Sequence, residues 1–222
     1  MPAKIVKGHC PNCGPGILAE VVADFHDEWQ DDDVGIWGND DHRIMQCRGC
    51  SRVYFQTTGI FSEDDPQGGP NITHWPLPEK RKQPKWLWRL IEADENLPSL
   101  INETYTALNN DAPVLAAIGL RTIFDRGSEL LGVDQNKPFA EKLNELVKKG
   151  NIGEDERGIL GALTDAGSAA AHRGWRPSDK QLDTMFDIVE GFIHRSFFVR
   201  HAAKQLKAGV PPKSKNSNSQ KT

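Results

Sequence analysis

The spacing of apolar residues changes along the chain and becomes helical from about residue 97. Apolar side chains recur there at intervals of three and four residues, which is the period of an amphipathic helix. This pattern predicts a helical bundle over residues 97–207. We expect five helices, in the segments LPSLINETYTALNN, APVLAAIGLRTIFDRGSELLG, KPFAEKLNELVKKG and EDERGILGALTDAGSAAAH, and from Ser178 to Lys207.

Capping residues and small residues indicate where these helices begin and how they pack. Ser178 and Gln181 match a capping box, in which each side chain accepts a hydrogen bond from the other residue's backbone N–H. The fourth helix is rich in Gly, Ala and Ser, so we expect it to lie centrally, with neighbouring backbones close to it. The same small residues also suit a homodimer through the second and fourth helices. Residues 208–222 have no apolar pattern and are expected to be disordered.

The first part of the chain has shorter apolar runs, which predict strands. The β-rich runs in residues 1–61 are ILAEVVADF, RIMQC and RVYFQTTGIF, and an acidic loop is expected at DEWQDDDVGIWGNDDHR. Residues 62–96 contain five prolines and a Gly-Gly pair, so we expect a linker without a regular element before WLWRLIEADE. The expected fold class is α+β, with a small β domain followed by an all-α bundle.

The linker ends in a mixture of basic and aromatic residues, EKRKQPKWLWR. Such a composition suits a nucleic-acid backbone with stacked bases. The alternative is that Trp86 and Trp88 pack the linker onto a domain, and burial of large aromatic side chains favours this second interpretation.

Composition and charge narrow the class of protein. Hydrophobic residues make up 37% and charged residues 26%, which is a globular balance. No apolar segment approaches the roughly 20 residues that cross a bilayer, and MPAKIVKGHC lacks the apolar core of a signal peptide, so we expect a cytoplasmic protein without a membrane segment. The net charge of −4 argues against a protein that coats nucleic acid unspecifically.

The four cysteines form the strongest motif. They occur as two identical pairs, Cys10-Pro-Asn-Cys13 and Cys47-Arg-Gly-Cys50. Both thiolates of a CxxC pair can turn toward one cation, and four thiolates complete the tetrahedral shell of zinc. Disulfides or a redox motif are the alternatives, but the chain shows no secretion signal and carries two pairs instead of one. The sequence therefore predicts a structural zinc ion in a zinc ribbon over residues 1–61.

The predicted ribbon is acidic. Residues 1–60 carry 5 Lys and Arg against 9 Asp and Glu, a balance that repels phosphate. A protein contact through Trp29 and Trp37 is one interpretation, and coverage of a thin core by these tryptophans is the other.

The chain resembles the bacterial family called domain of unknown function 4145, whose members often place a zinc ribbon before a helical domain. The matching stretches are LPSLINETYTALNNDAPVLAAIGLRTIFDRGSELLG and KLNELVKKGNIGEDERGILGALTDAGSAAAH, with the cysteine pairs in support. The family is similar to the HEPN superfamily, which includes metal-independent ribonucleases of toxins and phage-defence systems and also many inactive binding modules. The resemblance thus implies a prokaryotic protein of restriction or defence.

Active members of that superfamily place an arginine before a histidine on one helix, with four to six residues between them. The histidine would be His172, but Asp165, Ala166 and Gly167 stand where the arginine is expected. The resemblance offers Arg121 and Asp125 on the second helix as a substitute pair, which would meet His172 across the bundle.

Three interpretations of His172 follow. In the favoured one it hydrogen-bonds into a buried network with Arg121 and Asp125, because buried polar groups need partners. In the second it belongs to a binding face with Arg173, Trp175 and Arg176. In the third it is a catalytic base, with Arg121 or Arg173 as the cation that stabilises developing charge.

The function expected from these patterns is non-enzymatic. The chain would be an accessory or adaptor module that binds a protein, RNA or DNA partner, and a divergent ribonuclease that uses His172 is the alternative. Motifs for NTP hydrolysis, dinucleotide redox chemistry and zinc proteolysis are missing from the sequence.

Overall fold

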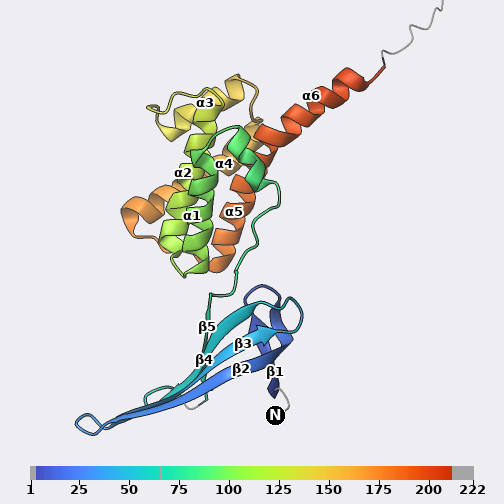
Figure 1. Cartoon of the computed structure of the whole chain (residues 1–222). Helices are drawn as coiled ribbons and strands as arrows, with labels where there is room; N and C mark the ends of the chain where they lie inside the picture. The colour runs from blue at the N-terminus through green and yellow to red at the C-terminus, as the bar shows by residue number, and fades with distance from the viewer. Residues whose placement is uncertain (1–3, 66, 212–222) are drawn as a thin grey trace, which may run out of the picture. The chain divides into compact units, whose positions relative to one another are not determined.

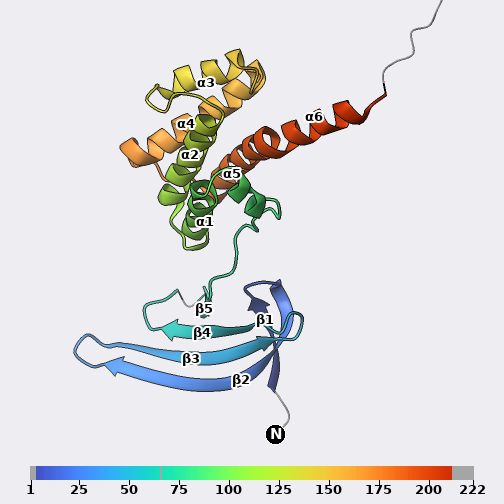
Figure 2. The ribbon, with the colours of Figure 1, turned by 45° about the horizontal axis from the view of Figure 1, so that its top comes forward.

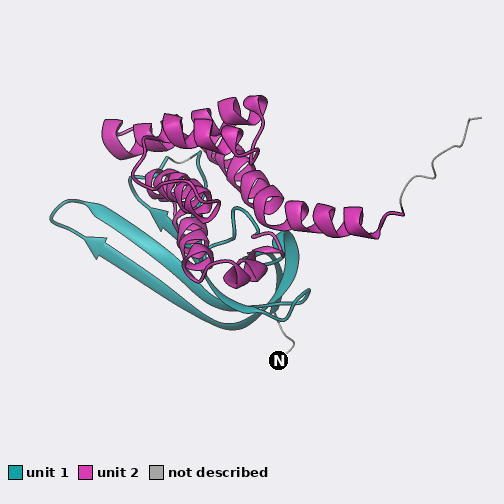
Figure 3. Cartoon of the chain, turned by 90° about the horizontal axis from the view of Figure 1, so that it is seen from above, with its two compact units in different colours: residues 1–82 teal, residues 83–222 magenta. Residues whose placement is uncertain are grey.

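A computed structural model describes residues 4–65 and 67–211 of the chain. The chain forms two compact units, residues 1–82 and residues 83–222 (Figure 3). The first unit is an antiparallel sheet and the second is helical (Figure 1), so the α+β fold class is confirmed. None of the helices in the described residues is both long and apolar enough to span a membrane.

The first unit is a meander of five antiparallel strands in the order β1-β2-β3-β4-β5. Each strand pairs with the next along the chain, and β2 and β3 form a long hairpin (Figure 2). The strands are β1 Lys4–Cys10, β2 Gly14–Asp31, β3 Ile36–Cys47, β4 Val53–Phe61 and β5 Asn71–Trp75.

The prediction of an acidic loop over residues 27–43 is wrong. Residues 27–43 lie almost entirely in β2 and β3, and only a tight turn joins the two strands. Gly35 adopts a φ of +71° in this turn and donates its backbone N–H to the carbonyl of Asp31. A turn that glycine permits, followed by direct strand pairing, replaces the loop that the run of acids suggested.

A β-bulge in β2 changes which residues share a face of the sheet. Val21 pairs with Met45, but Ala23 pairs with Ile44, so Val22 is an extra residue. Side chains alternate between faces along a strand, and an inserted residue reverses the alternation. The odd-numbered residues of β2 beyond the bulge, from Ala23 to Trp29, therefore face the side opposite to Val21.

The buried core of the sheet unit is small and lies on one face near the cysteines. Its members are Cys10, Ala19, Met45, Cys47 and Tyr54. Two of these five residues are candidate metal ligands, which means that few apolar contacts hold this unit together without a bound ion.

The predicted linker contains two regular elements. Strand β5 completes the sheet, and the 3-10 helix η1, Leu87–Glu92, belongs to the helical unit, where Leu87 and Leu90 are buried. Trp86 packs against His194 and Phe198, as the packing interpretation predicts, whereas Trp88 is exposed. The expectation of no regular element before Trp86 is wrong, because β5 forms backbone pairs that the prolines around it leave possible.

The predicted helices are present. They are α1 Asn96–Asn109, α2 Pro113–Leu130, α3 Phe139–Lys148, α4 Glu154–Arg173 and α5 Asp179–His194, followed by a π-helical turn η2, Arg195–Val199, and α6 Arg200–Gly209. Ser178 and Gln181 form the predicted capping box at the start of α5. Helix α6 extends two residues into the stretch expected to be disordered, and residues 210 and 211 follow it without a regular element. The remaining residues of that prediction, 212–222, lie outside the described part of the chain.

Helix α4 packs closely on α2 within the chain. A Cβ atom at Gly167 would lie 2.6 Å from Cβ of Arg121 and 3.2 Å from the carbonyl oxygen of Ala117. Both distances are shorter than ordinary contacts, so only glycine fits at this crossing. The small residues of α4 therefore serve an intramolecular contact, and the homodimer stays a prediction.

Candidate functional site

The four cysteines lie in two turns of the sheet unit. Cys10 and Cys13 flank the turn from β1 to β2, and Cys47 and Cys50 flank the turn from β3 to β4. Glycine at position 14, with a φ of +93°, lets the first turn close. The antiparallel pairing of β2 with both β1 and β3 brings the two turns to the same end of the sheet.

The sulfur atoms are arranged as ligands of one ion. The Sγ atoms of Cys10 and Cys50 lie 3.7 Å apart, and those of Cys13 and Cys47 lie 3.9 Å apart. All four lie within 4.8 Å of one another. Thiolates bound tetrahedrally at about 2.3 Å from a cation are about 3.8 Å apart, whereas the sulfurs of a disulfide are about 2.0 Å apart. The donor set therefore fits a tetrahedral metal ion, and the four cysteines are a candidate metal site.

Backbone N–H groups add to this fit. The N–H of Gly49 donates to Sγ of Cys47 over 3.3 Å. A hydrogen bond from the backbone of Arg52 lowers the pKa of Cys50 to about 6, whereas a side-chain hydrogen bond with Cys50 raises the pKa of Cys13 to about 12. One thiolate is thus already favoured, and cation binding would remove the remaining protons.

The histidines of the sheet unit lie outside the cysteine cluster, as expected from a complete set of four thiolates. The ring of His9 lies against that of His74 in a tilted arrangement, and His42 contacts the hydroxyl of Thr57. His26 contacts Glu28 and Asp41 through its two ring nitrogens, and these carboxylates raise its pKa.

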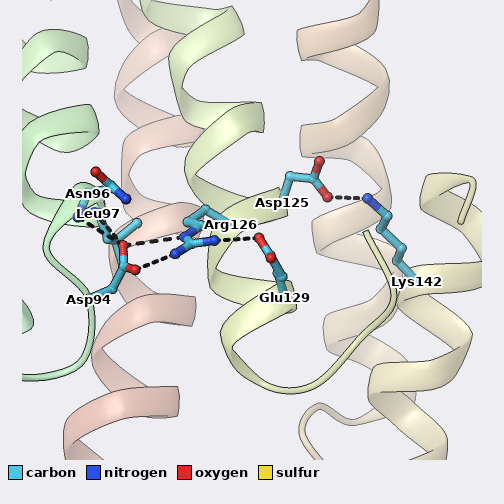
Figure 4. A network of polar contacts seen from close by, with 7 residues as sticks. All are labelled: Asp94, Asn96, Leu97, Asp125, Arg126, Glu129 and Lys142. Carbon is cyan, nitrogen blue, oxygen red and sulfur yellow. Dashed lines mark hydrogen bonds and ion pairs between the residues drawn. The ribbon is translucent and has the colours of Figure 1, made fainter. Parts of the chain in front are cut away.

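Arg121 and Asp125 of α2 have partners other than His172. Asp125 forms an ion pair with Lys142 of α3, a side chain buried between the helices (Figure 4). The guanidinium carbon of Arg121 lies 4.3 Å from the ring centre of Phe139. The two residues therefore fix the packing of α3 on α2.

The prediction that His172 joins a buried network with Arg121 and Asp125 is wrong. His172 is exposed in the last turn of α4. It follows Gly167, the α4 residue that touches Arg121, by five positions. Five residues turn a helix by about 140° beyond a full turn, so His172 points away from the face that meets Arg121.

The residues predicted to form a binding face are arranged around the end of α4. Arg173 and Arg176 are exposed, and Trp175 is half-buried against the helical core. Gly174, with a φ of +65°, ends the helix and reverses the chain toward Trp175. Arg173 donates to the carbonyl of Asp165 over 3.4 Å. Arg173, Trp175 and Arg176 thus lie beside His172 at and just beyond the C-terminal end of α4.

Sequence analysis missed an ionic network in the helical unit. Asp94 accepts from the backbone N–H groups of Asn96 and Leu97 and so caps α1, while it also pairs with Arg126 of α2 (Figure 4). Arg126 donates in addition to Glu129 over 2.7 Å. The acidic residue before α1 was the only sequence signal, because its partner lies 32 positions away.

A second feature that the sequence did not reveal is an aromatic face on the sheet, on the side opposite to its core. Rings stack across the strands in two rows. Phe25 stacks on His42 at 6.2 Å and His42 on Phe55 at 5.8 Å, and Trp29 stacks on Phe61 at 5.9 Å. We define the aromatic face by the aromatic and aliphatic side chains that share this side, which are Phe25, Trp29, Ile44, Val53, Phe55, Phe61 and Trp75.

Comparisons with known proteins identify the helical unit. The family model described as Domain of unknown function (DUF4145) matches residues 102–214, which is half of the chain. No curated protein matches the chain, and no solved structure does either. The match begins within α1 and runs through all the later helices, so the chain belongs to the DUF4145 family.

Proposed function

We propose that the chain is a non-enzymatic adaptor module that binds a partner protein through its sheet unit. The observation that carries this proposal is the aromatic face. An antiparallel sheet with one buried face ordinarily turns polar side chains to water on the other. Here the outer face carries a row of apolar side chains, of which Phe25 and Trp75 are 66% and 74% exposed. Exposed apolar patches of this kind mark interaction surfaces.

The metal that would support this module is zinc. Four thiolates in a closed tetrahedral set leave no position for water or substrate, which is typical of a structural ion. Cys10, Cys13, Cys47 and Cys50 would hold it, and the zinc would supply folding free energy that the small core of the sheet lacks.

The arrangement around His172 favours binding over catalysis. A histidine base needs a neighbouring cation or donor aimed at the reacting group. Asp125 is paired with Lys142 and Arg121 is stacked on Phe139, so neither is aimed at His172. The relation to HEPN proteins, and with it a role in restriction or phage defence, stays a proposal that rests on resemblance alone.

Affinity purification with surface variants tests the proposal. We expect a partner protein that is retained by the unmodified chain and by His172→Ala, and lost with the pair Phe25→Ser and Trp75→Ser. Trp88→Ser is the matched control, because Trp88 is 70% exposed and lies on η1 of the helical unit. Retention by the Phe25 and Trp75 variant would contradict the proposal.

Cleavage of a mixed-sequence RNA by the same proteins tests the enzymatic alternative. The buffer contains no free divalent cation and no chelator, so bound zinc stays in place. We expect no cleavage by any variant. Cleavage that disappears with His172→Ala, in a protein that keeps its helical circular dichroism, would overturn the non-enzymatic proposal.

A further inference from the structure

We propose that the aromatic face recognises a protein segment in which Arg or Lys side chains alternate with apolar ones. This inference rests on the proposed function and adds the chemistry of the partner. Its basis is the position of two carboxylates within the aromatic face.

Asp27 and Asp40 lie directly opposite each other in the β2–β3 ladder. The alternation along β2 places Asp27 on the same face as Phe25 and Trp29, between them. Like charges at directly opposite positions of a sheet destabilise it. Neither carboxylate has an ion pair or a hydrogen bond with another side chain in the described part of the chain.

On the opposite face of the β2–β3 hairpin, the acidic side chains have basic partners. Asp41 contacts both His26 and Arg43, and His26 also contacts Glu28. Compensating basic groups therefore contact the acids of that face. On the aromatic face the neighbouring basic side chain, His42, contacts the hydroxyl of Thr57 and neither Asp27 nor Asp40. A cation supplied by a partner would pair with Asp27 and Asp40.

The aromatic rings on either side of these carboxylates suit the same partner. A guanidinium or ammonium group is attracted to the faces of Trp and Phe as well as to carboxylates. Phe25 and Trp29 would contact its apolar neighbours, while Asp27 and Asp40 pair with the cation between them. Arg is favoured over Lys because its planar group can both stack on a ring and bridge two carboxylates.

Single-stranded nucleic acid is the competing occupant, because exposed aromatic rows on a sheet can stack bases. Such sites follow the phosphate backbone with basic groups. The aromatic face instead carries unpaired carboxylates between its rings, which would repel phosphate. Charge complementarity therefore selects a cationic protein segment.

Fluorescence anisotropy with three labelled probes tests the inference on the full, zinc-loaded chain. The probes are a peptide of alternating Arg and Leu, a peptide of alternating Glu and Leu, and an oligomer of dT. We expect binding of the Arg-Leu peptide alone. The double variant Asp27→Asn and Asp40→Asn should weaken it by about tenfold or more.

A matched control variant distinguishes pairing with Asp27 and Asp40 from unspecific attraction between opposite charges. The pair Asp32→Asn and Asp33→Asn removes the same charge from the turn beyond β2 and should leave the affinity within about twofold. Equal weakening by both pairs would overturn the inference in favour of unspecific attraction.

The variants also separate this inference from the proposed function. Two outcomes would overturn the inference of a cationic segment: no binding of the Arg-Leu peptide, or binding that depends on Phe25 and Trp75 but not on Asp27 and Asp40. The proposed protein-binding function would then still be tested by the affinity purification. Binding of oligo-dT that is lost with Phe25→Ser and Trp75→Ser would overturn both the inference and the protein-binding function.

Discussion

Gly167 of α4 lies against Arg121 of α2 so closely that a methyl group at residue 167 would come within 2.6 Å of the arginine Cβ. The nearby carbonyl of Ala117 belongs to the backbone and cannot move independently of α2. We expect Gly167→Ala to lower the free energy of unfolding of the helical unit by about 1–3 kcal/mol, because the two helices must separate. Urea unfolding followed by circular dichroism at the helical minimum measures this change.

Gly158, on the same helix, provides the control. It is exposed, and a Cβ atom there would contact nothing within 4 Å. Gly158→Ala should raise the free energy of unfolding by up to about 1 kcal/mol, because alanine favours the helix over glycine. The same sign for both substitutions would contradict the close packing of α4 on α2.

Removal of the metal should unfold the sheet unit and leave the helical unit folded. The sheet core is small and two of its members are cysteines, whereas the helical core is formed by side chains of η1 and all five helices α1–α5. We expect one zinc ion per chain by elemental analysis, and loss of amide exchange protection in strands β1–β5 after chelation. Cys47→Ser should have the same effect, and Ser51→Ala, at a nearby non-ligand position, should not. Loss of protection throughout the helices would contradict independent folding of the two units.

The ion pair between Asp94 and Arg126 should make the stability of the helical unit depend on pH. The hydrogen bond from Arg126 holds the pKa of Asp94 below its ordinary value, and the N–H of Leu97 lowers this pKa further. A carboxylate with a lowered pKa in the folded state stabilises above its unfolded pKa, near 4, and this contribution is lost as the pH falls through the folded value. The free energy of unfolding should therefore fall below about pH 4.

Asp94→Asn isolates this contribution, because asparagine can still cap α1 but carries no charge. We expect a loss of about 1–3 kcal/mol near neutral pH, the range for hydrogen bonds to charged groups, and a shallower decline at acidic pH. Asp165→Asn changes an exposed carboxylate of α4 and should alter neither quantity by more than about 0.5 kcal/mol. An unchanged acid decline in Asp94→Asn would show that other carboxylates cause it.

The sequence predicted the features that depend on local spacing. Helix α4 was expected from Glu154 to His172 and ends one residue later, because acids favour its first turn and Gly174 stops it. The cysteine cluster was likewise predictable, since a CxxC turn fixes the geometry of each pair.

Features that depend on partners far along the chain were not predictable. Simple alternation would place Phe25 on the same face as Ala19 and Val21, but the bulge at Val22 moves it to the opposite face. The direction of His172 depends on where α2 crosses α4, which no local pattern specifies.

The contact between Trp29 and Gly38 leads to the last prediction. A Cβ atom at Gly38 would lie 2.7 Å from the indole ring of Trp29, which covers the glycine across the β2–β3 pair. Gly38→Ala should therefore displace the indole from the sheet, weaken its stacking on Phe61, and lower the affinity for the Arg-Leu peptide. Incorporation of 5-fluorotryptophan, with the Trp29 signal assigned by Trp29→Phe, measures the displacement as a change in the fluorine chemical shift. The signal of Trp88, in the helical unit, should stay unchanged and serves as the internal control. An unchanged Trp29 signal in Gly38→Ala would mean that the ring does not rest on the glycine in solution.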